Sequence, residues 1–167
     1  NGWQDLERYR DRTDDSTINV WRRHYGKIGQ DAIDRWDGAW TRRSINGGIT
    51  WEPAVKSFAS SPHGPIELED GSLLYLGTNK PGHDRRLISV KSIDEGRSWE
   101  VIGDIPVPDE YKKALPFAEP HAVEVEPGRI VSLWRHVPRD RPNEAFLQQS
   151  ESGDGGVTWT VVHPTPM

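Results

Sequence analysis

The sequence SGDGGVTW at residues 152–159 decides the fold, because two variants of it occur earlier in the chain. These variants are SINGGITW at residues 44–51 and SIDEGRSW at residues 92–99. All three segments fit the pattern Ser-x-Asp/Asn-x-Gly-x-Ser/Thr-Trp, and the Trp that ends it recurs after 48 and then 60 residues. A pattern that returns at such distances is typical of a chain built from repeated supersecondary units.

Each copy of the pattern has the composition of a tight turn followed by a strand. The Asp or Asn side chain caps nearby backbone N–H groups, and the Gly two residues later adopts positive φ. The Ser/Thr-Trp pair then begins a strand, from which the Trp folds back into the core. We therefore expect a purely structural role for the repeated positions, which are Ser44, Asn46, Gly48, Trp51, Ser92, Asp94, Gly96, Trp99, Ser152, Asp154, Gly156 and Trp159.

A second, weaker repeat lies between these copies. The segment IELEDGSLL at residues 66–74 resembles VEVEPGRIV at residues 123–131. Both segments read as a strand, a turn at Asp-Gly or Pro-Gly, and another strand. The repeating unit is therefore four antiparallel strands, and such units in series form the blades of a β-propeller.

The predicted chain is all-β, with about three blades in one segment that covers residues 1–167. We expect blade 1 at about 1–55, blade 2 at about 56–104 and blade 3 at about 105–167. In the first blade, strands are expected at 17–23 and 39–44. In the other two blades, strands are expected at about 63–68, 72–77, 86–92 and 98–102, and at about 121–125, 129–135, 145–151 and 158–162.

The composition excludes several classes of partner. The net charge is −5, and the 21 Lys and Arg are dispersed among 26 acidic residues, which argues against a nucleic-acid partner. No stretch approaches the about 20 apolar residues of a membrane-spanning helix, so no membrane partner is expected. The chain has no Cys, which excludes disulfides and thiolate metal ligands.

The three Trp-terminated segments resemble the Asp-box (BNR) repeat of sialidases and related propellers, and we call them the Asp boxes. The segments SPHGPI at 61–66 and EPHAVE at 119–124 resemble a bacterial group of sialidase-like proteins. The Arg pair at 42–43 also resembles the corresponding stretch of bacterial sialidases. The resemblance implies a sialidase-like β-propeller, and a secreted or periplasmic location rather than a cytoplasmic one.

Two departures from the sialidase pattern bear on function. The early Phe-Arg-Ile-Pro motif, which supplies one arginine of a carboxylate-binding triad in sialidases, is absent. Sialidases have six blades, so this chain corresponds to about half a propeller, and the nucleophilic Tyr and two further arginines would follow residue 167. We therefore expect partner blades from the remainder of the same protein or from a second copy, as in a homodimer.

The candidate catalytic residues lie on the face opposite the Asp boxes, where the resemblance places the active site of sialidases. His63 and His121 precede equivalent inner strands, and His serves as an acid or base near neutral pH. Glu119 is close enough in sequence to tune His121 or to act as an acid itself. Asp34 lies in an early loop where sialidases place an acid/base Asp. Its rivals are Asp31 and Asp37, and also Asp14 and Asp15 if the strand begins later. The alternative is a ring of polar residues around a water-filled channel.

The candidate substrate-binding residues are Arg135, His136, Arg85 and Trp36. An arginine grips a carboxylate or sulfate through paired hydrogen bonds, although Arg135 has an alternative as an ion-pair partner of Asp140 or Glu144. An exposed Trp stacks on sugar faces, and Trp36 has the alternative of packing under its own loop. No spacing is diagnostic of a metal site, His83-Asp84 included, and we expect neither a metal nor a cofactor.

Three functions remain open from the sequence. The first is a sialidase-like exo-glycosidase that acts on acidic or complex glycans. The second is a polysaccharide lyase that acts on uronic-acid polymers and uses His for proton abstraction and Arg for charge neutralisation. The third is a non-catalytic propeller that binds carbohydrate or protein, since fold alone does not determine function.

Overall fold

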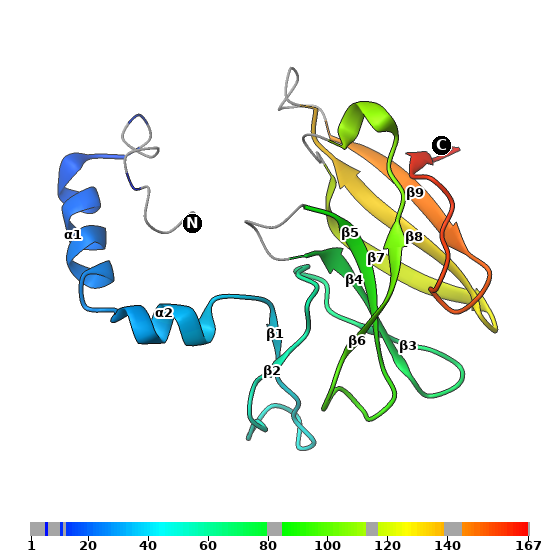
Figure 1. Cartoon of the computed structure of the whole chain (residues 1–167), viewed down its shortest axis with the longest axis horizontal. Coiled ribbons are helices and arrows are strands. Elements are labelled where there is room, and N and C mark those ends of the chain that lie inside the picture. The colour runs from blue at the N-terminus through cyan, green and yellow to red at the C-terminus, as the bar shows by residue number, and fades with distance from the viewer. Residues whose placement is uncertain are drawn as a thin grey trace. The chain divides into compact units, whose positions relative to one another are not determined.

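The computed structural model describes residue 6, residue 11 and residues 13–79, 85–112, 117–138 and 145–166. The chain divides into two compact units, Asn1–Gly38 and Ala39–Met167. The helices labelled in Figure 1 belong to the first unit, and the labelled strands belong to the second.

The first unit contains two helices, α1 (Asp15–Tyr25) and α2 (Gln30–Trp36). The strand predicted at 17–23 is therefore wrong. Asp14 caps the helix by accepting a hydrogen bond from the backbone N–H of Thr17 at 2.9 Å. Asp15 lies in the first turn and Arg22, Arg23 and His24 lie in the last turn, so the charges complement the helix dipole. These capping and end-charge signals outweigh the strand preference of the β-branched residues inside the segment.

The second unit contains two four-stranded antiparallel sheets. One has the order β3-β4-β5-β6, and the other has the order β10-β9-β8-β7. We call them the β3–β6 blade and the β7–β10 blade. Their strands are β3 (Ile66–Glu67), β4 (Leu73–Thr78), β5 (Leu87–Ser92), β6 (Glu100–Ile105), β7 (Phe117–Glu126), β8 (Arg129–His136), β9 (Phe146–Ser152) and β10 (His163–Pro164).

Sequential strands pair with one another in both blades, as the repeat predicts. The turns at Asp70-Gly71 and Pro127-Gly128 join the first two strands of each blade. Two strands lie later than expected: β6 begins at Glu100 and β10 begins at His163, whereas strands were expected over 98–102 and 158–162. In the latter stretch the Val162 N–H donates to the Pro106 carbonyl at 2.9 Å, so this backbone group bonds to the preceding blade instead of its own ladder.

The first Asp box lies between two short strands, β1 (Trp40–Thr41) and β2 (Val55–Lys56). They correspond in position to the third and fourth strands of the other blades, because the box separates the members of each pair. The fold is therefore an all-β propeller segment of two complete blades and one two-stranded part. A short 3-10 helix, η2 (Asp109–Tyr111), lies between β6 and β7.

All three Asp boxes close through the same local hydrogen bonds. In the third box, Asp154 Oδ1 accepts from the Thr158 N–H at 2.8 Å, and Ser152 Oγ accepts from the Gly156 N–H at 2.9 Å. The same two bonds measure 2.8 Å and 2.8 Å in the second box, and 2.9 Å and 2.9 Å in the first. Gly156 has a φ of 93°, as the turn requires.

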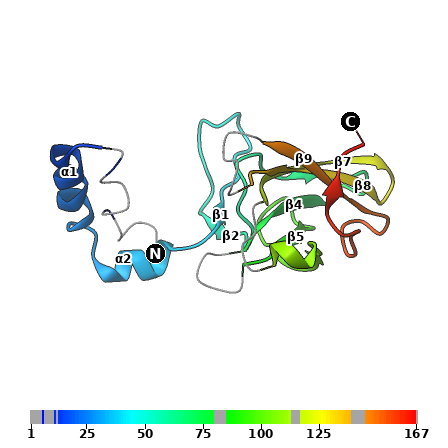
Figure 2. The ribbon, with the colours of Figure 1, turned by 90° about the horizontal axis from the view of Figure 1, so that it is seen from above.

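The two blades stack face to face, as the view from above shows (Figure 2). Leu74, Leu76 and Leu87 of the β3–β6 blade pack against Trp134 and Ile130 of the β7–β10 blade. The Trp side chains of the second and third boxes also donate hydrogen bonds to the sheet that precedes them in the chain. Trp99 Nε1 donates to Thr41 Oγ1 at 2.9 Å, and Trp159 Nε1 donates to Ser89 Oγ at 3.3 Å. Trp159 Nε1 also donates to Gly156 O of its own box at 2.9 Å.

Candidate functional site

Two histidines from different blades lie side by side on the described part of the propeller. His63 lies just before β3 and His121 lies within β7. Their ring centroids are 5.6 Å apart, with the ring planes inclined by 51°. Both side chains are exposed, so both are accessible to a solute.

The segment that carries His63 is held in place by a buried tyrosine. The Tyr75 hydroxyl donates to the Ser61 carbonyl at 2.6 Å and accepts from the Ser61 N–H at 2.8 Å. Ser61 Oγ in turn donates to the Pro120 carbonyl of β7 at 3.0 Å. Burial raises the pKa of Tyr75, so the hydroxyl keeps its proton and acts as donor and acceptor together. These bonds hold the stretch before β3 against β7.

Glu119 adopts an unusual backbone conformation at the start of β7. Its φ is 51°, which is the left-handed region that non-glycine residues rarely occupy. The pairing of β7 with β8 shifts register between Ala118 and His121, so Glu119 lies within a bulge. Bulges re-aim side chains and are frequent beside functional sites.

Arg135 forms an ion pair with Glu119 across β7 and β8. Arg135 Nη2 donates to Glu119 Oε1 at 2.6 Å, and both side chains remain partly exposed. The expected alternative partners Asp140 and Glu144 lie outside the described residues. The pairing fixes the guanidinium beside the carboxylate, and solvent still reaches both groups.

These four polar side chains share one concave pocket of about 460 Å³. The lining residues are His63, Glu119, His121, Leu133, Arg135, Ala145, Phe146 and Leu147. Two imidazoles, a carboxylate and a guanidinium therefore face a wall of apolar side chains. This arrangement suits a ligand with an acidic or hydroxyl-rich edge and an apolar ring face.

The apolar wall was not among the sequence-predicted site residues. Leu133, Phe146 and Leu147 are all exposed large hydrophobic residues on β8 and β9. Their signal in the sequence is ambiguous, because apolar residues in a strand are more often core residues. Only their exposure in the folded chain identifies them.

The structure places His136 away from this pocket. Its side chain is buried and its ring lies 5.1 Å from the ring of Phe117 and 5.0 Å from that of Tyr111. Successive residues of a strand point to opposite sides of the sheet, so His136 faces inward when Arg135 faces outward. This burial does not support the expected direct contact of His136 with substrate.

The other predicted site residues are not lining residues of this pocket either. Arg85 is exposed and lies two residues before β5. Asp34 lies on α2 in the first unit, where its Oδ1 accepts a hydrogen bond from Gln30 Nε2 at 2.7 Å. Its rivals Asp31 and Asp37 lie in the same unit, and His83 and Asp84 lie outside the described residues. The catalytic role of Asp34 and the binding role of Arg85 stay predictions.

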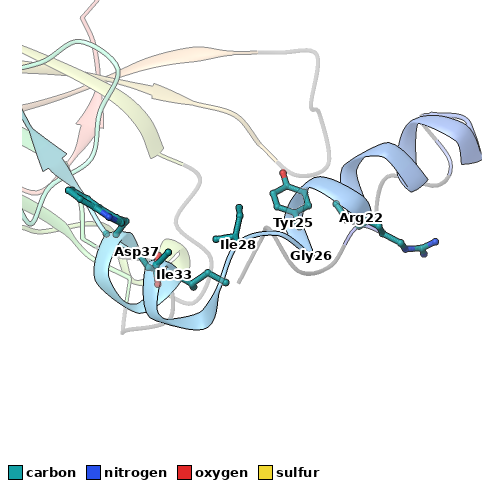
Figure 3. Close-up of a pocket in the computed structure, with 10 residues that line it drawn as sticks. Arg22, Tyr25, Gly26, Ile28, Ile33 and Asp37 are labelled. Atoms are coloured by element: carbon teal, nitrogen blue, oxygen red, sulfur yellow. The ribbon is translucent and has the colours of Figure 1, made fainter.

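Trp36 contributes to a different concavity, within the helical unit. This cavity of about 660 Å³ is lined by both helices and the segment that joins them, with Tyr25, Ile28 and Ile33 among its residues (Figure 3). Trp36 is more than half exposed. Stacking of Trp36 on a sugar therefore stays a prediction, and it concerns this cavity.

His163 and Glu151 form a polar pair near the end of the described chain. His163 Nε2 lies 3.1 Å from Glu151 Oε2. The hydrogen bond to Glu151 raises the pKa of His163, with a smaller contribution from the Pro164 carbonyl. His163 is thus an ion-paired residue outside the pocket of about 460 Å³.

The described part of the chain contains neither a metal-binding cluster nor a membrane-spanning helix. Within it, no group of three His, Asp or Glu side chains is suited to hold a metal ion. No helix there has the length and apolar character needed to cross a bilayer.

The repeated four-stranded blades define the fold as a sialidase-like β-propeller, and the comparisons agree. No protein-family model and no curated protein matches the chain. A protein of unknown function from Dyadobacter fermentans superposes with a TM-score of 0.60 and 18% identity, over 77% of this chain and 38% of that one. The NanB sialidase from Streptococcus pneumoniae superposes with a TM-score of 0.54 and 22% identity, over 76% of this chain and 19% of that one.

Two further kinds of enzyme share the fold. An α-L-arabinofuranosidase from Fusarium graminearum superposes with a TM-score of 0.54 and 20% identity, over 76% of this chain and 41% of that one. An α-L-arabinanase from Penicillium chrysogenum gives a TM-score of 0.53 and 16% identity. The chain therefore spans less than half the length of these solved structures.

Proposed function

We propose that this chain is part of a glycoside hydrolase of the sialidase-like propeller type, acting on an acidic or complex glycan. The observation that carries the proposal is the pocket where Glu119, Arg135, His63 and His121 meet beside an apolar wall. The solved structures with this fold include a sialidase, an arabinofuranosidase and an arabinanase, which supports a glycosidase in general more than a sialidase in particular.

Glu119 is our candidate for one of the two catalytic carboxyl groups. Glycoside hydrolysis needs a proton donor on the leaving oxygen and a second group that supplies a nucleophile or activates water. Glu119 is the carboxylate among the described lining residues of the pocket. The second group would therefore come from residues beyond those that line this pocket.

Arg135 and the two histidines would orient the sugar. Arginine binds a carboxylate with two parallel hydrogen bonds, which suits an acidic sugar, and the partial exposure of Arg135 leaves donors for a ligand. Imidazoles hydrogen-bond hydroxyl groups as donors or acceptors. Phe146 offers an aromatic face to the apolar side of a sugar ring.

A polysaccharide lyase is the second candidate, and the paired histidines favour it. A lyase needs a base that removes a proton beside a uronate carboxylate, and a cation that neutralises that carboxylate. His63 or His121 would serve as the base and Arg135 as the cation. Binding of a glycan without turnover is the remaining outcome.

The test is a comparison of Glu119→Gln with Glu126→Gln. Both residues lie on β7 and both are ion-paired, Glu119 with Arg135 and Glu126 with Arg129 at 3.5 Å, but Glu126 does not line the pocket. The chain is incubated with aryl sialosides, aryl arabinofuranosides and uronic-acid polymers. Released sugar is measured for hydrolysis, and unsaturated uronate is measured by ultraviolet absorbance for lysis.

We expect the rate of hydrolysis to fall at least 100-fold in Glu119→Gln and to stay unchanged in Glu126→Gln. An unsaturated product that persists in Glu119→Gln and disappears in His121→Ala would transfer the proposal to the lyase. Equal activity in the two Glu variants would refute the role of Glu119. Binding of glycan by the wild type with no product of either kind would leave a carbohydrate-binding propeller.

A further inference from the structure

The first Asp box contains a side-chain amide where the other two boxes contain a carboxylate. Asn46 occupies the position that Asp94 and Asp154 hold in those boxes. Its Oδ1 atom accepts hydrogen bonds from the Thr50 N–H at 2.9 Å and from Ser44 Oγ at 3.0 Å. The two equivalent bonds to Asp94 in the second box are both 2.8 Å long. The first box therefore closes in the same way as the others, although it lacks their negative charge.

The amide differs from the carboxylates at its second polar atom. In the third box the Thr158 hydroxyl donates to Asp154 Oδ2 at 2.6 Å. In the first box Asn46 Nδ2 donates to Thr50 Oγ1 at 2.8 Å, so the hydroxyl there is the acceptor. A hydrogen bond from a hydroxyl to a carboxylate is charge-assisted and stronger than one between neutral groups. The first box is thus the one whose turn lacks this stabilisation.

The residue that follows Asn46 makes its amide chemically vulnerable. The backbone nitrogen of the next residue can attack a side-chain amide, and Gly47 has no Cβ to hinder that approach. Asn46 and Gly47 are both exposed, and a Cβ at Gly47 would meet no atom within 4 Å. The chain has one other Asn-Gly pair, Asn1-Gly2, which lies outside the described residues.

This exposure is a property of the box itself and does not depend on where the chain begins. The β3–β6 blade contacts strands on both of its sides, through Trp99 and through the core shared with the β7–β10 blade. In its box Glu95 is nevertheless exposed, and Asp94 is only half-buried. Further blades would therefore leave the amide of Asn46 accessible to water.

The hydrogen bonds of the box also activate the amide. The Thr50 N–H and the Ser44 hydroxyl both donate to the same oxygen, Asn46 Oδ1. Two donors on a carbonyl oxygen draw electrons from the carbon and stabilise the negative charge that develops on the oxygen when a nucleophile adds. The first box thus supplies its own oxyanion-stabilising donors to an amide that precedes glycine.

We infer that Asn46 is a site of spontaneous deamidation, which converts the first box into a true Asp box. The Gly47 nitrogen loses its proton to a base in solution and bonds to the Cγ atom of Asn46. The bond from Cγ to Nδ2 then breaks, and Nδ2 takes up a proton and leaves as ammonia. Water opens the resulting succinimide ring at either of its two carbonyl carbons. The overall change consumes one water, releases one ammonia and requires no oxidant or reductant.

The two ring-opening products have opposite effects on the box. Opening at the main-chain nitrogen's bond to Cγ gives aspartate, to which the Thr50 hydroxyl can donate as the Thr158 hydroxyl donates to Asp154. Opening at the main-chain carbonyl gives isoaspartate, which routes the backbone through the side-chain carbon and lengthens it. The turn is short and its bonds join residues two to four positions apart, so it does not close around this longer backbone.

Peptide mapping of the folded chain after incubation at mildly alkaline pH is the first test. Trypsin cleaves after Arg43 and Lys56, and the peptide 44–56 contains Asn46 as its sole side-chain amide. We expect two new forms of this peptide, each with the mass of an amide converted to an acid. One should elute with the same peptide prepared from Asn46→Asp, and the other, isoaspartate, should elute separately.

The chain offers two matched controls. Asn19 is exposed as well, but Val20 follows it, and the branched Cβ of Val hinders attack, so the peptide 13–22 should keep its amide. Gly47→Glu places at this position the residue type that the second box carries as Glu95, at a φ of 59°. Conversion in this variant should fall below detection over the same incubation, while the turn still forms.

The second test compares the urea unfolding of Asn46→Asp with that of the wild type at neutral pH. The midpoint should shift to a higher urea concentration in Asn46→Asp, because the carboxylate gains the charge-assisted bond from Thr50. Asn46→Ala should shift it to a lower concentration, because the Thr50 N–H loses its acceptor.

Three results would overturn the inference. The first is a peptide 44–56 that keeps its amide throughout the incubation, and the second is conversion that proceeds equally at Asn19 or in Gly47→Glu. The third is an Asn46→Asp midpoint at or below that of the wild type, which would show that aspartate does not complete the box. No readout uses a glycan, so these outcomes are separate from the test of the proposed activity.

Discussion

Gly103→Ala should destabilise the propeller unit strongly, although the change adds a single methyl group. Gly103 lies in β6, and a Cβ there would lie 2.3 Å from the Val157 carbonyl oxygen and 3.0 Å from the Gly156 carbonyl oxygen. Both oxygens belong to the backbone of the third Asp box. A flexible side chain could move aside, but this backbone is held by its own box hydrogen bonds.

The cost has two parts. Overpacking of a rigid contact costs about 1–3 kcal/mol. Separation of the blades would also weaken the bonds of Trp159 Nε1 to Ser89 Oγ and of Ser89 Oγ to Gly156 O, now 3.3 Å and 2.7 Å, at about 1 kcal/mol each. We therefore expect a loss of about 3 kcal/mol in the free energy of unfolding, which lowers Tm by about 10 °C for a unit of this size.

Urea unfolding and thermal unfolding, followed by tryptophan fluorescence and circular dichroism, measure this loss. Gly153→Ala is the matched control, because a Cβ at Gly153 meets no atom within 4 Å and its box is the same one. The control should stay within about 0.5 kcal/mol of the wild type. A Gly103→Ala variant as stable as the control would refute the close blade contact.

Three further predictions concern stability and the site. Asp94 and Asp154 have pKa values of about 2, because hydrogen bonds from the hydroxyl and backbone N–H of the last polar box residue stabilise each carboxylate. The two carboxylates therefore stabilise the fold above the unfolded pKa of about 3.9, and this stabilisation is lost as pH falls towards 2. The urea concentration at the unfolding midpoint should decrease in that pH window. It should decrease less steeply in an Asp94→Asn, Asp154→Asn double variant. Trp134→Ala should cost about 4 kcal/mol in a urea titration, because Trp134 is fully buried between the blades; a cost below about 1 kcal/mol would contradict that packing. Tyr75→Phe should cost about 1–2 kcal/mol through the two lost bonds to Ser61, and it should lower activity on any substrate found; unchanged stability and activity would show that Tyr75 does not hold this segment.

The sequence predicted the blades well because the decisive interactions are short-range. In each Asp box, the hydrogen bonds join residues two to four positions apart, so an eight-residue pattern suffices to specify the turn. The strands on either side then follow from the turns at Gly71 and Gly128. Residues 17–23 were predicted as a strand and instead form part of α1, which the capping Asp14 and the charges at its two ends stabilise.

The site was predictable only in part. The repeat placed His63 and His121 at equivalent positions, and the structure brings their rings to 5.6 Å from each other. The pairing of Glu119 with Arg135 depends on a bulge in β7 that the sequence pattern does not reveal. The inward position of His136 depends on strand register, in which a shift of one residue moves a side chain to the other face.

The sequence by itself determined the Asp-box turns and the four-stranded repeat, because these depend on neighbouring residues. Only the tertiary structure decided which side chains share the pocket and which surfaces stay uncovered. Trp99 meets Thr41 across 58 residues of sequence, and Trp159 meets Ser89 across 70. Such contacts are decided by how whole blades stack, since the free energy of burying their apolar faces sets the positions of residues that are distant in the chain.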